Sequence, residues 1–251
     1  MGKKRKGQLI VALDVDTLEA ARNLIDTLSP VVDIFKVGSQ LFTACGPAAV
    51  RFIQARGKKV FLDLKYHDIP NTVASAVNSA VGISVDVHQV MDNPQANQSD
   101  SSIFMYTLHT VGGKNMMQSA VEAGVKAAQK HGVNKPLAVG VTVLTSEEKK
   151  DNIQALVLER ARLAKAAGLD GVVASGQEVE IIRRELGEDF IIVTPGIRPS
   201  GSDVGDQKRV TTPAESIQKG SDFLVVGRPI VAAQDPLRAA EKIVKEIHSV
   251  C

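Results

Sequence analysis

Short apolar runs alternate with longer amphipathic stretches along almost the whole chain. Runs that are continuously apolar and rich in Val and Ile are typical of parallel strands buried on both faces. Most of eight predicted strands have this pattern, and they lie at residues 9–15, 34–37, 60–64, 103–107, 137–142, 171–174, 191–194 and 223–226.

The stretches between these strands have apolar residues spaced for one face of a helix. The clearest are residues 17–28, 114–130, 151–167, 178–186 and 236–250. Thr17 is a suitable N-cap, and Gly168 and Gly187 stand where helix C-caps are expected. The alternation predicts an α/β fold, a single (β/α)8 TIM barrel over residues 1–251. A doubly wound open sheet is the alternative, and it is disfavoured because no G-x-G-x-x-G follows the first strand.

One segment, residues 82–102, interrupts the alternation with the sequence GISVDVHQVMDNPQANQSDSS. Loops of this length are uncommon inside compact domains. We interpret the segment as a polar insertion between the third helix and the fourth strand, on the face away from the chemistry. Its Asp86 and His88 are compatible with surface positions or with subunit contacts.

Composition narrows the class of protein. With 44% hydrophobic and 23% charged residues, the chain resembles soluble globular proteins, and its apolar runs are too short to cross a bilayer. The basic tail, residues 1–8, contains KKRK and accounts for the net charge of +2. We interpret it as a solvated start rather than a segment that binds nucleic acid or membranes. Two cysteines, and no Cys/His cluster with metal-ligand spacing, indicate a reduced, cytoplasmic setting without a metal.

Charged residues follow the first three predicted strands. Asp14 follows the first and Lys36 the second, while Asp63, Lys65 and Asp68 stand at the end of the third. Residues 63 and 65 are two apart, so their side chains point to the same side of a strand. Alone, the D-x-K-x-x-D pattern favours a structural ion pair. Together with charges on adjoining strands it favours an electrostatic active site, because barrel active sites lie at the carboxyl ends of the strands.

The other side of the predicted barrel mouth carries neutral and anion-binding groups. Thr145 follows the fifth strand, and Arg198 follows the seventh, at the start of a Pro-, Gly- and Ser-containing loop that runs to Gln207. Such a loop is typical of a lid that closes over a ligand. Gly227 and Arg228 follow the eighth strand, and the loops after strands seven and eight usually bind phosphate in this fold. The sequence therefore predicts a phosphate site opposite a lysine–carboxylate array.

Eight motifs in this order and spacing resemble the bacterial type of orotidine 5′-phosphate decarboxylase: ALDV, FKVG, FLDLKYHDIPNT, LHTVGG, VTVLTS, VTPGIRP, GDQKRV and VVGRP. The similarity runs from about Leu9 to the last helix, apart from residues 82–102. It implies a TIM barrel that decarboxylates orotidine 5′-monophosphate to UMP in de novo pyrimidine biosynthesis. It also implies a homodimer with active sites at the interface, and neither a metal nor a cofactor.

The resemblance assigns a role to each charged position. Asp14 and Lys36 would contact the ribose hydroxyls, and Lys36 would also belong to the charged network. Asp63 would lie against the substrate carboxylate, and Lys65 would donate the proton. Asp68 would complete the catalytic set from the other subunit.

The same resemblance extends the binding site beyond these charges. Thr145 would bind near the pyrimidine, and the phosphate would be held by Arg198, Gln207, Gly227 and Arg228. The nucleotide-binding stretch would comprise Asp63, Leu64, Lys65, Tyr66, His67, Asp68, Ile69, Pro70, Asn71 and Thr72. Without the resemblance, His67 and His109 are interpreted as structural, because neither has a spaced partner for nucleophilic or metal chemistry.

Loss of CO2 from C6 of the pyrimidine suits these residue types. The reaction leaves a carbanion with no π-system to absorb it, so a fixed ammonium can stabilise the charge and then supply the proton. One alternative is a Mg2+-dependent sugar-phosphate decarboxylase or aldolase of the same superfamily, and Lys36 argues against its cation site. The other is a catalytically silent, phosphate-binding barrel that uses its basic tail for a partner.

Overall fold

A computed structural model describes residues 7–83, 103–144, 152–199 and 211–250 of the chain. Within these residues eight parallel strands form a closed barrel, in which each strand pairs with the next and β8 pairs with β1. The strands are β1 (Gln8–Ala12), β2 (Ile34–Gly38), β3 (Lys59–Tyr66), β4 (Met105–His109), β5 (Leu137–Val141), β6 (Gly171–Val173), β7 (Ile191–Thr194) and β8 (Phe223–Val226). The predicted TIM barrel is confirmed.

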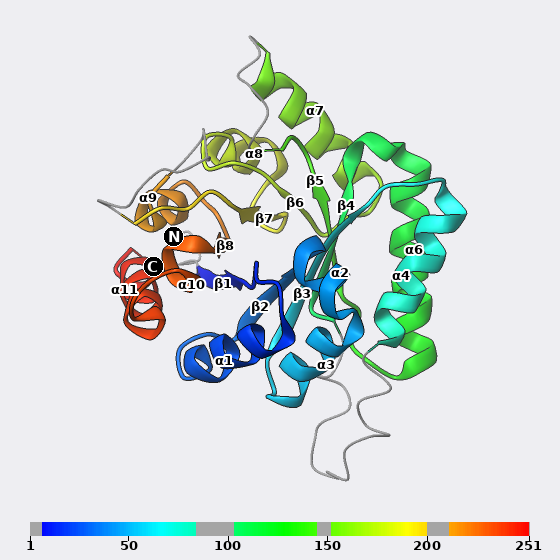
Figure 1. The fold of residues 1–251 in the computed structure, drawn as a ribbon. Coiled ribbons are helices and arrows are strands. Elements are labelled where there is room, and N and C mark those ends of the chain that lie inside the picture. The colour runs from blue at the N-terminus through cyan, green and yellow to red at the C-terminus, as the bar shows by residue number, and fades with distance from the viewer. Residues whose placement is uncertain (1–6, 84–102, 145–151, 200–210, 251) are drawn as a thin grey trace.

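Helices surround the barrel on all sides (Figure 1). They are α1 (Leu18–Leu28), α2 (Ser39–Cys45), α3 (Pro47–Ala55), α4 (Pro70–Gly82), α6 (Gly113–His131), α7 (Ile153–Ala166), α8 (Val179–Leu186), α9 (Pro213–Gln218), α10 (Arg228–Val231) and α11 (Pro236–His248), with a 3-10 turn η2 (Thr110–Gly112). The five helices predicted from periodicity all form, and none of their ends differs from the prediction by more than two residues. None of the helices in the described part of the chain is long and apolar enough to span a membrane.

Local sequence signals set several of these ends. Thr17 is the N-cap of α1, and its hydroxyl accepts a hydrogen bond from the Ala20 amide at 3.1 Å. Gly187 is the C-cap of α8, with a positive φ of 82° that glycine adopts without strain. Gly168 lies one residue beyond the C-cap of α7, Ala167.

Strand side chains alternate between two apolar layers. The layer inside the barrel consists of buried residues from every strand except β6: Ile10, Ala12, Ile34, Phe61, Met105, Val139, Val193 and Val225. The larger layer lies between the strands and the surrounding helices and contains the intervening strand positions, such as Val11, Phe35 and Leu62. Since both faces of each strand are covered, the strands read as continuous apolar runs. The polar residues at their carboxyl ends are left to line the mouth.

Three predicted features lie mostly outside the described residues. Residues 1–6 of the basic tail are not described. Almost all of the polar insertion, including Asp86 and His88, falls in 84–102. Most of the predicted lid falls in 200–210.

Candidate active site

A cavity opens at the carboxyl ends of the strands. On one side it is lined by four charged residues at the ends of β1, β2 and β3, namely Asp14, Lys36, Asp63 and Lys65. Across the mouth it is lined by residues that follow β7 and β8, namely Pro195, Gly196, Arg198, Gly227 and Arg228. Apolar residues complete the lining. Val141, Val143, Leu144, Val173 and Ala174 come from β5 and β6 and the segments after them, and Ala12, Phe61 and Val225 come from β1, β3 and β8. The structure therefore brings together the two halves of the site that the strand ends predict.

The four charged side chains form a continuous array of alternating sign. Lys36 Nζ lies 3.0 Å from Asp14 Oδ1 and 3.6 Å from Asp63 Oδ2. Lys65 Nζ lies 2.8 Å from the same oxygen of Asp63. The side chains of Lys36 and Asp63 are only 10% and 13% exposed, so these charges interact with little screening by water.

The protonation of Asp63 follows from these neighbours. Burial is the largest single influence on its pKa and raises it, because it penalises the charged form. The charges of Lys36 and Lys65, with hydrogen bonds from Lys65 and Thr107, together outweigh burial and hold the pKa below its ordinary value. Asp63 is therefore an anion near neutral pH, fixed between two cations.

The strand that carries Asp63 and Lys65 is irregular at its end. The pairing of β3 with β4 runs from Leu62 opposite Tyr106 to Tyr66 opposite Leu108, with a register shift between them. Within the shift, Lys65 has a φ of +52°, the sole positive value among the non-glycine residues that the structure describes. Such a backbone is uncommon outside glycine and occurs where surrounding contacts enforce it, often at functional sites.

Thr107 on β4 contacts both charged residues of this irregular segment. Its hydroxyl accepts a hydrogen bond from the Lys65 amide at 2.8 Å and donates one to Asp63 Oδ1 at 2.9 Å. The side chain is fully buried. Sequence reasoning did not select Thr107, because a threonine within a strand is ordinary and nothing local distinguishes it.

Gly38, at the end of β2, lies close to the array and was also missed. A Cβ atom at this position would stand 2.7 Å from Lys36 Nζ and 3.4 Å from Asp14 Oδ1. The backbone there is extended, with φ −96°, so any residue could adopt it. A side chain at this position would displace the Lys36 ammonium from the space that it occupies.

The side of the cavity that carries Arg198 and Arg228 is held by contacts with the backbone. The Arg198 amide donates to the Thr211 carbonyl at 3.0 Å, and its guanidinium Nη1 donates to the Ile197 carbonyl at 2.9 Å. Arg228 is the first residue of α10. At Gly227 a Cβ would lie 3.5 Å from Asp14 Oδ2, so this glycine adjoins the charged array.

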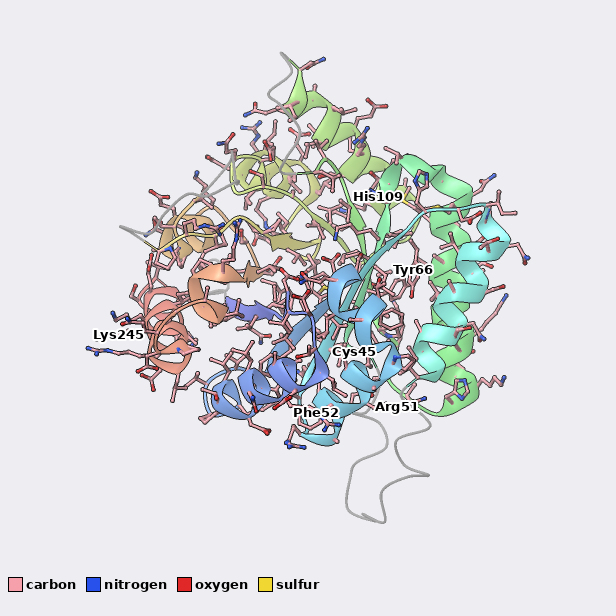
Figure 2. All side chains as sticks on the ribbon, in the orientation of Figure 1. Cys45, Arg51, Phe52, Tyr66, His109 and Lys245 are labelled. Carbon is pink, nitrogen blue, oxygen red and sulfur yellow. The ribbon has the colours of Figure 1, made fainter. Side chains whose placement is uncertain are left out.

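Most of the predicted nucleotide-binding stretch lies away from this cavity in the single chain. Asp63 and Lys65 line it, while Leu64 and Tyr66 pack against the apolar layer outside the barrel. Tyr66 lies on the side of β3 that faces α4 (Figure 2), and burial raises its pKa to about 12.

The remainder of the stretch forms the approach to α4. Asp68 is exposed, and its carboxylate accepts a hydrogen bond from the Ile69 amide at 2.6 Å. Ile69 is 66% exposed, and Pro70, Asn71 and Thr72 begin α4. Contact of these residues with a nucleotide stays a prediction.

The two histidines near the array contact one another. The rings of His67 and His109 have centroids 5.7 Å apart. Burial, and then the neighbouring His67 and Lys65, lower the pKa of His109. A structural role for both stays a prediction.

Two predicted site residues, Thr145 and Gln207, lie outside the described part of the chain. Across the ranges that the structure does describe, no group of three or more His, Cys, Asp or Glu residues is arranged to hold a metal ion.

Comparison with known proteins gives one consistent result. Residues 7–243 match the sequence model of the orotidine 5′-phosphate decarboxylase / HUMPS family. The chain is 46% identical over 254 residues to the orotidine 5′-phosphate decarboxylase of Moorella thermoacetica, covering 98% of this chain and 94% of the relative. It is 47% identical over 248 residues to that of Geobacter sp. (strain M21), covering 96% and 95%.

A solved structure agrees with the sequence relatives. The crystal structure of orotidine 5′-phosphate decarboxylase from Lactobacillus acidophilus superimposes with a TM-score of 0.77 at 34% identity. The superposition covers 96% of this chain and 99% of that one.

Proposed function

Because this chain belongs to the orotidine 5′-phosphate decarboxylase / HUMPS family, we propose that it converts orotidine 5′-monophosphate to UMP and CO2. The reaction would supply UMP in de novo pyrimidine biosynthesis. Relatives that carry the decarboxylase name match over nearly the full length of both chains, which favours this activity over others in the family.

The observation that supports the proposal most is the Asp14–Lys36–Asp63–Lys65 array on one side of the cavity. A neutral ligand would gain little from such an array, whereas a substrate whose charge changes during the reaction would. Asp63 and Lys65, 2.8 Å apart, present an anion and a cation to the same point of a bound molecule. This pair suits a reaction in which a carboxylate leaves and a carbanion takes its place.

The chemical step uses the two residues in turn. The substrate carboxylate would lie against Asp63, where like charge disfavours the ground state. The bond from C6 to the carboxylate breaks, CO2 departs, and the electron pair stays on C6. The Lys65 ammonium stabilises this charge and donates its proton to C6. The resulting amine regains a proton from water.

Lys36 and Asp14 would bind the ribose hydroxyls. Their ion pair at 3.0 Å leaves the carboxylate of Asp14 half exposed, so it can accept a hydrogen bond from a ligand. Lys36 would also hold Asp63, at 3.6 Å, in its charged form. Lys36 would thus contact both the bound ribose and the Asp63 carboxylate beside the reacting carbon.

The phosphate would be held across the mouth by Arg198, Gly227 and Arg228. Guanidinium groups are suited to phosphate, because their N–H groups match its oxygen geometry. This position also agrees with the usual phosphate site of the fold, after the seventh and eighth strands. Gln207 and Thr145 would add contacts to the phosphate and the pyrimidine.

We further propose a homodimer in which Asp68 completes the site of the other subunit. In the single chain Asp68 is exposed and does not line the cavity, although it stands three residues after Lys65. The neighbouring Ile69 exposes most of a large apolar side chain, as interface residues do before association. Residues Ile69 to Thr72 would lie at the same interface.

The test is the ultraviolet absorbance of orotidine 5′-monophosphate incubated with the purified protein in EDTA. We expect conversion to UMP by the wild type, and loss of turnover by several orders of magnitude in Lys65→Ala, because the proton donor is gone. Thermal unfolding of both proteins checks that the variant retains its fold. Substantial activity in a folded Lys65→Ala protein would remove Lys65 as the proton donor.

Absence of conversion by the folded wild type would contradict the proposed activity. The same protein would then be assayed on sugar phosphates with added Mg2+, the substrates of the superfamily alternative. Conversion that stops in EDTA would contradict the metal-free mechanism.

A further inference from the structure

The end of β3 has more residues than its partner strand can pair. Between the pairs Leu62–Tyr106 and Tyr66–Leu108, β3 contributes Asp63, Leu64 and Lys65, while β4 contributes Thr107 alone. Extra residues in one strand form a bulge, which bends the strand and redirects its side chains. Asp63 and Lys65 therefore owe their orientation to a segment in which the regular ladder is interrupted.

An interrupted ladder leaves backbone groups in need of partners. At Lys65 the amide hydrogen-bonds to the hydroxyl of Thr107, at 2.8 Å, in place of a β4 carbonyl. The same residue has the left-handed φ of +52°, which the surroundings must enforce. The Thr107 hydroxyl is thus the hydrogen-bond partner that fixes the backbone of Lys65.

The second bond of this hydroxyl fixes Asp63. A hydroxyl has one proton, and here it points to Asp63 Oδ1 at 2.9 Å, because the Lys65 amide already occupies a lone pair. The other carboxylate oxygen, Oδ2, receives Lys65 Nζ at 2.8 Å. Backbone, hydroxyl, carboxylate and ammonium form a closed ring of contacts around the proposed proton donor.

We propose that Thr107 is a positioning residue, which holds Asp63 and Lys65 in the relative geometry that decarboxylation and proton transfer require. The inference rests on the proposed function for its catalytic consequence. Thr107 would act through Asp63 and Lys65, because it is fully buried and does not line the cavity. A valine of similar shape fills the same space and makes neither hydrogen bond.

The test compares Thr107→Val with Thr107→Ser, which keeps the hydroxyl and loses the methyl group. We expect kcat of the valine variant to fall about 10²-fold, the size of effect that a displacement of reacting groups by 1 Å produces. KM should change much less, because ribose and phosphate contacts are retained. The serine variant should restore most of kcat.

Thr194→Val is the matched control. Thr194 is a buried strand residue whose hydroxyl hydrogen-bonds the Ser221 hydroxyl at 2.7 Å. The next residue, Pro195, lines the cavity, but Thr194 itself does not. Its replacement removes a buried hydroxyl from another strand of the barrel and should leave kcat unchanged. Thermal unfolding of all variants separates a loss of stability from a loss of positioning.

A second readout requires no turnover. The Thr107 hydrogen bond is one of the contacts that favour the charged form of Asp63, although burial is the larger, opposing influence. Its removal should raise the pKa of the Asp63 carboxyl. The titration is followed through the 13C NMR signal of this carboxyl, which is assigned because it is absent from the spectrum of Asp63→Asn. A role in packing alone would leave this pKa unchanged.

Wild-type kcat and an unchanged Asp63 titration in Thr107→Val would overturn the proposal, as would an equal loss of kcat in Thr107→Ser. Should the valine variant fail to fold, Thr107→Cys gives the same readouts, since a thiol is only a weak donor. A wild-type protein without decarboxylase activity would overturn the proposed function, and the Asp63 titration would still decide the role of Thr107.

Discussion

Lys36 lies between two carboxylates, and its position depends on the absence of a side chain at Gly38. The ammonium is held at 3.0 Å from Asp14 and 3.6 Å from Asp63, in the space that a Cβ of residue 38 would enter. Because the backbone at Gly38 is extended, a larger residue there would meet a limit of space and not of conformation.

We expect Gly38→Ala to fold normally and to lose activity. The added methyl group would displace Lys36 Nζ, now 2.7 Å from that position, and so disturb both carboxylates. We expect kcat/KM for orotidine 5′-monophosphate to fall about 10²-fold, as for other displacements of this size. Steady-state kinetics and thermal unfolding measure the two effects separately.

Gly82→Ala, at the end of α4, is the control for the same chemical change. Its Cβ would lie 3.7 Å from His131 Nε2, an ordinary contact. Equal kinetics in Gly38→Ala and Gly82→Ala would show that Lys36 tolerates displacement, contrary to this prediction.

At the scale of an element, helix α8 carries a buried arginine that hydrogen-bonds to segments next to the barrel. Arg183 hydrogen-bonds, at 2.7–3.2 Å, the carbonyls of Gly187, Glu188, Phe190 and Gly220 and the carboxylate of Asp222. These acceptors precede β7 and β8, so they lie at the end of the barrel opposite the cavity. Arg183 thus connects the segments that precede β7 and β8, the two strands whose other ends carry the proposed phosphate site.

We expect Arg183→Met to lower stability without changing catalysis. Methionine fills similar space but removes the hydrogen bonds of the guanidinium to the four carbonyls and to Asp222, which costs about 3 kcal/mol. For a protein of this size that lowers Tm by roughly 6–12 °C. Thermal unfolding, with kcat measured at 20 °C, checks both parts.

Arg184→Met is the neighbouring control. The Arg184 side chain is 69% exposed and its ion pair with Glu185 spans 3.8 Å, so its loss should cost less than about 0.5 kcal/mol. A Tm for Arg183→Met as high as that of Arg184→Met would contradict the role given to the buried arginine.

At the scale of the whole molecule, the proposed shared site predicts that two inactive variants recover activity when their subunits mix. Asp68→Ala and Lys65→Ala should each be inactive alone. In a mixed dimer, one of the two sites would receive intact Lys65 from one subunit and intact Asp68 from the other. With complete random exchange about a quarter of the wild-type activity should return, because half of the dimers are mixed.

The experiment mixes the two variants and follows UMP formation over time. Subunit exchange is monitored independently with a label on one variant. Exchange without recovery would exclude a shared site, and activity in Asp68→Ala alone would show that this carboxylate is not required.

The barrel, and residues that line both sides of its cavity, could be predicted from the sequence alone. Buried parallel strands need apolar residues at consecutive positions, so their number and order can be read locally, and the ends predicted for β7 and β8 agree with the structure. The spacing of Asp63 and Lys65 predicted that they lie together, since residues two apart share one side of a regular strand. Their orientation in the structure depends on the bulge at the end of β3. Arg198, Gly227 and Arg228 followed from the known use of strand ends in this fold.

How these residues are held depends on contacts between segments far apart in the sequence. The bulge in β3 arises from its pairing with β4, and the contact of Thr107 with Lys65 spans 42 positions of sequence. The role of Gly38 depends on where the ammonium of Lys36 lies, which no local pattern records. Periodicity reports which residues are buried, whereas hydrogen bonds and close contacts between distant segments exist only once the barrel has closed.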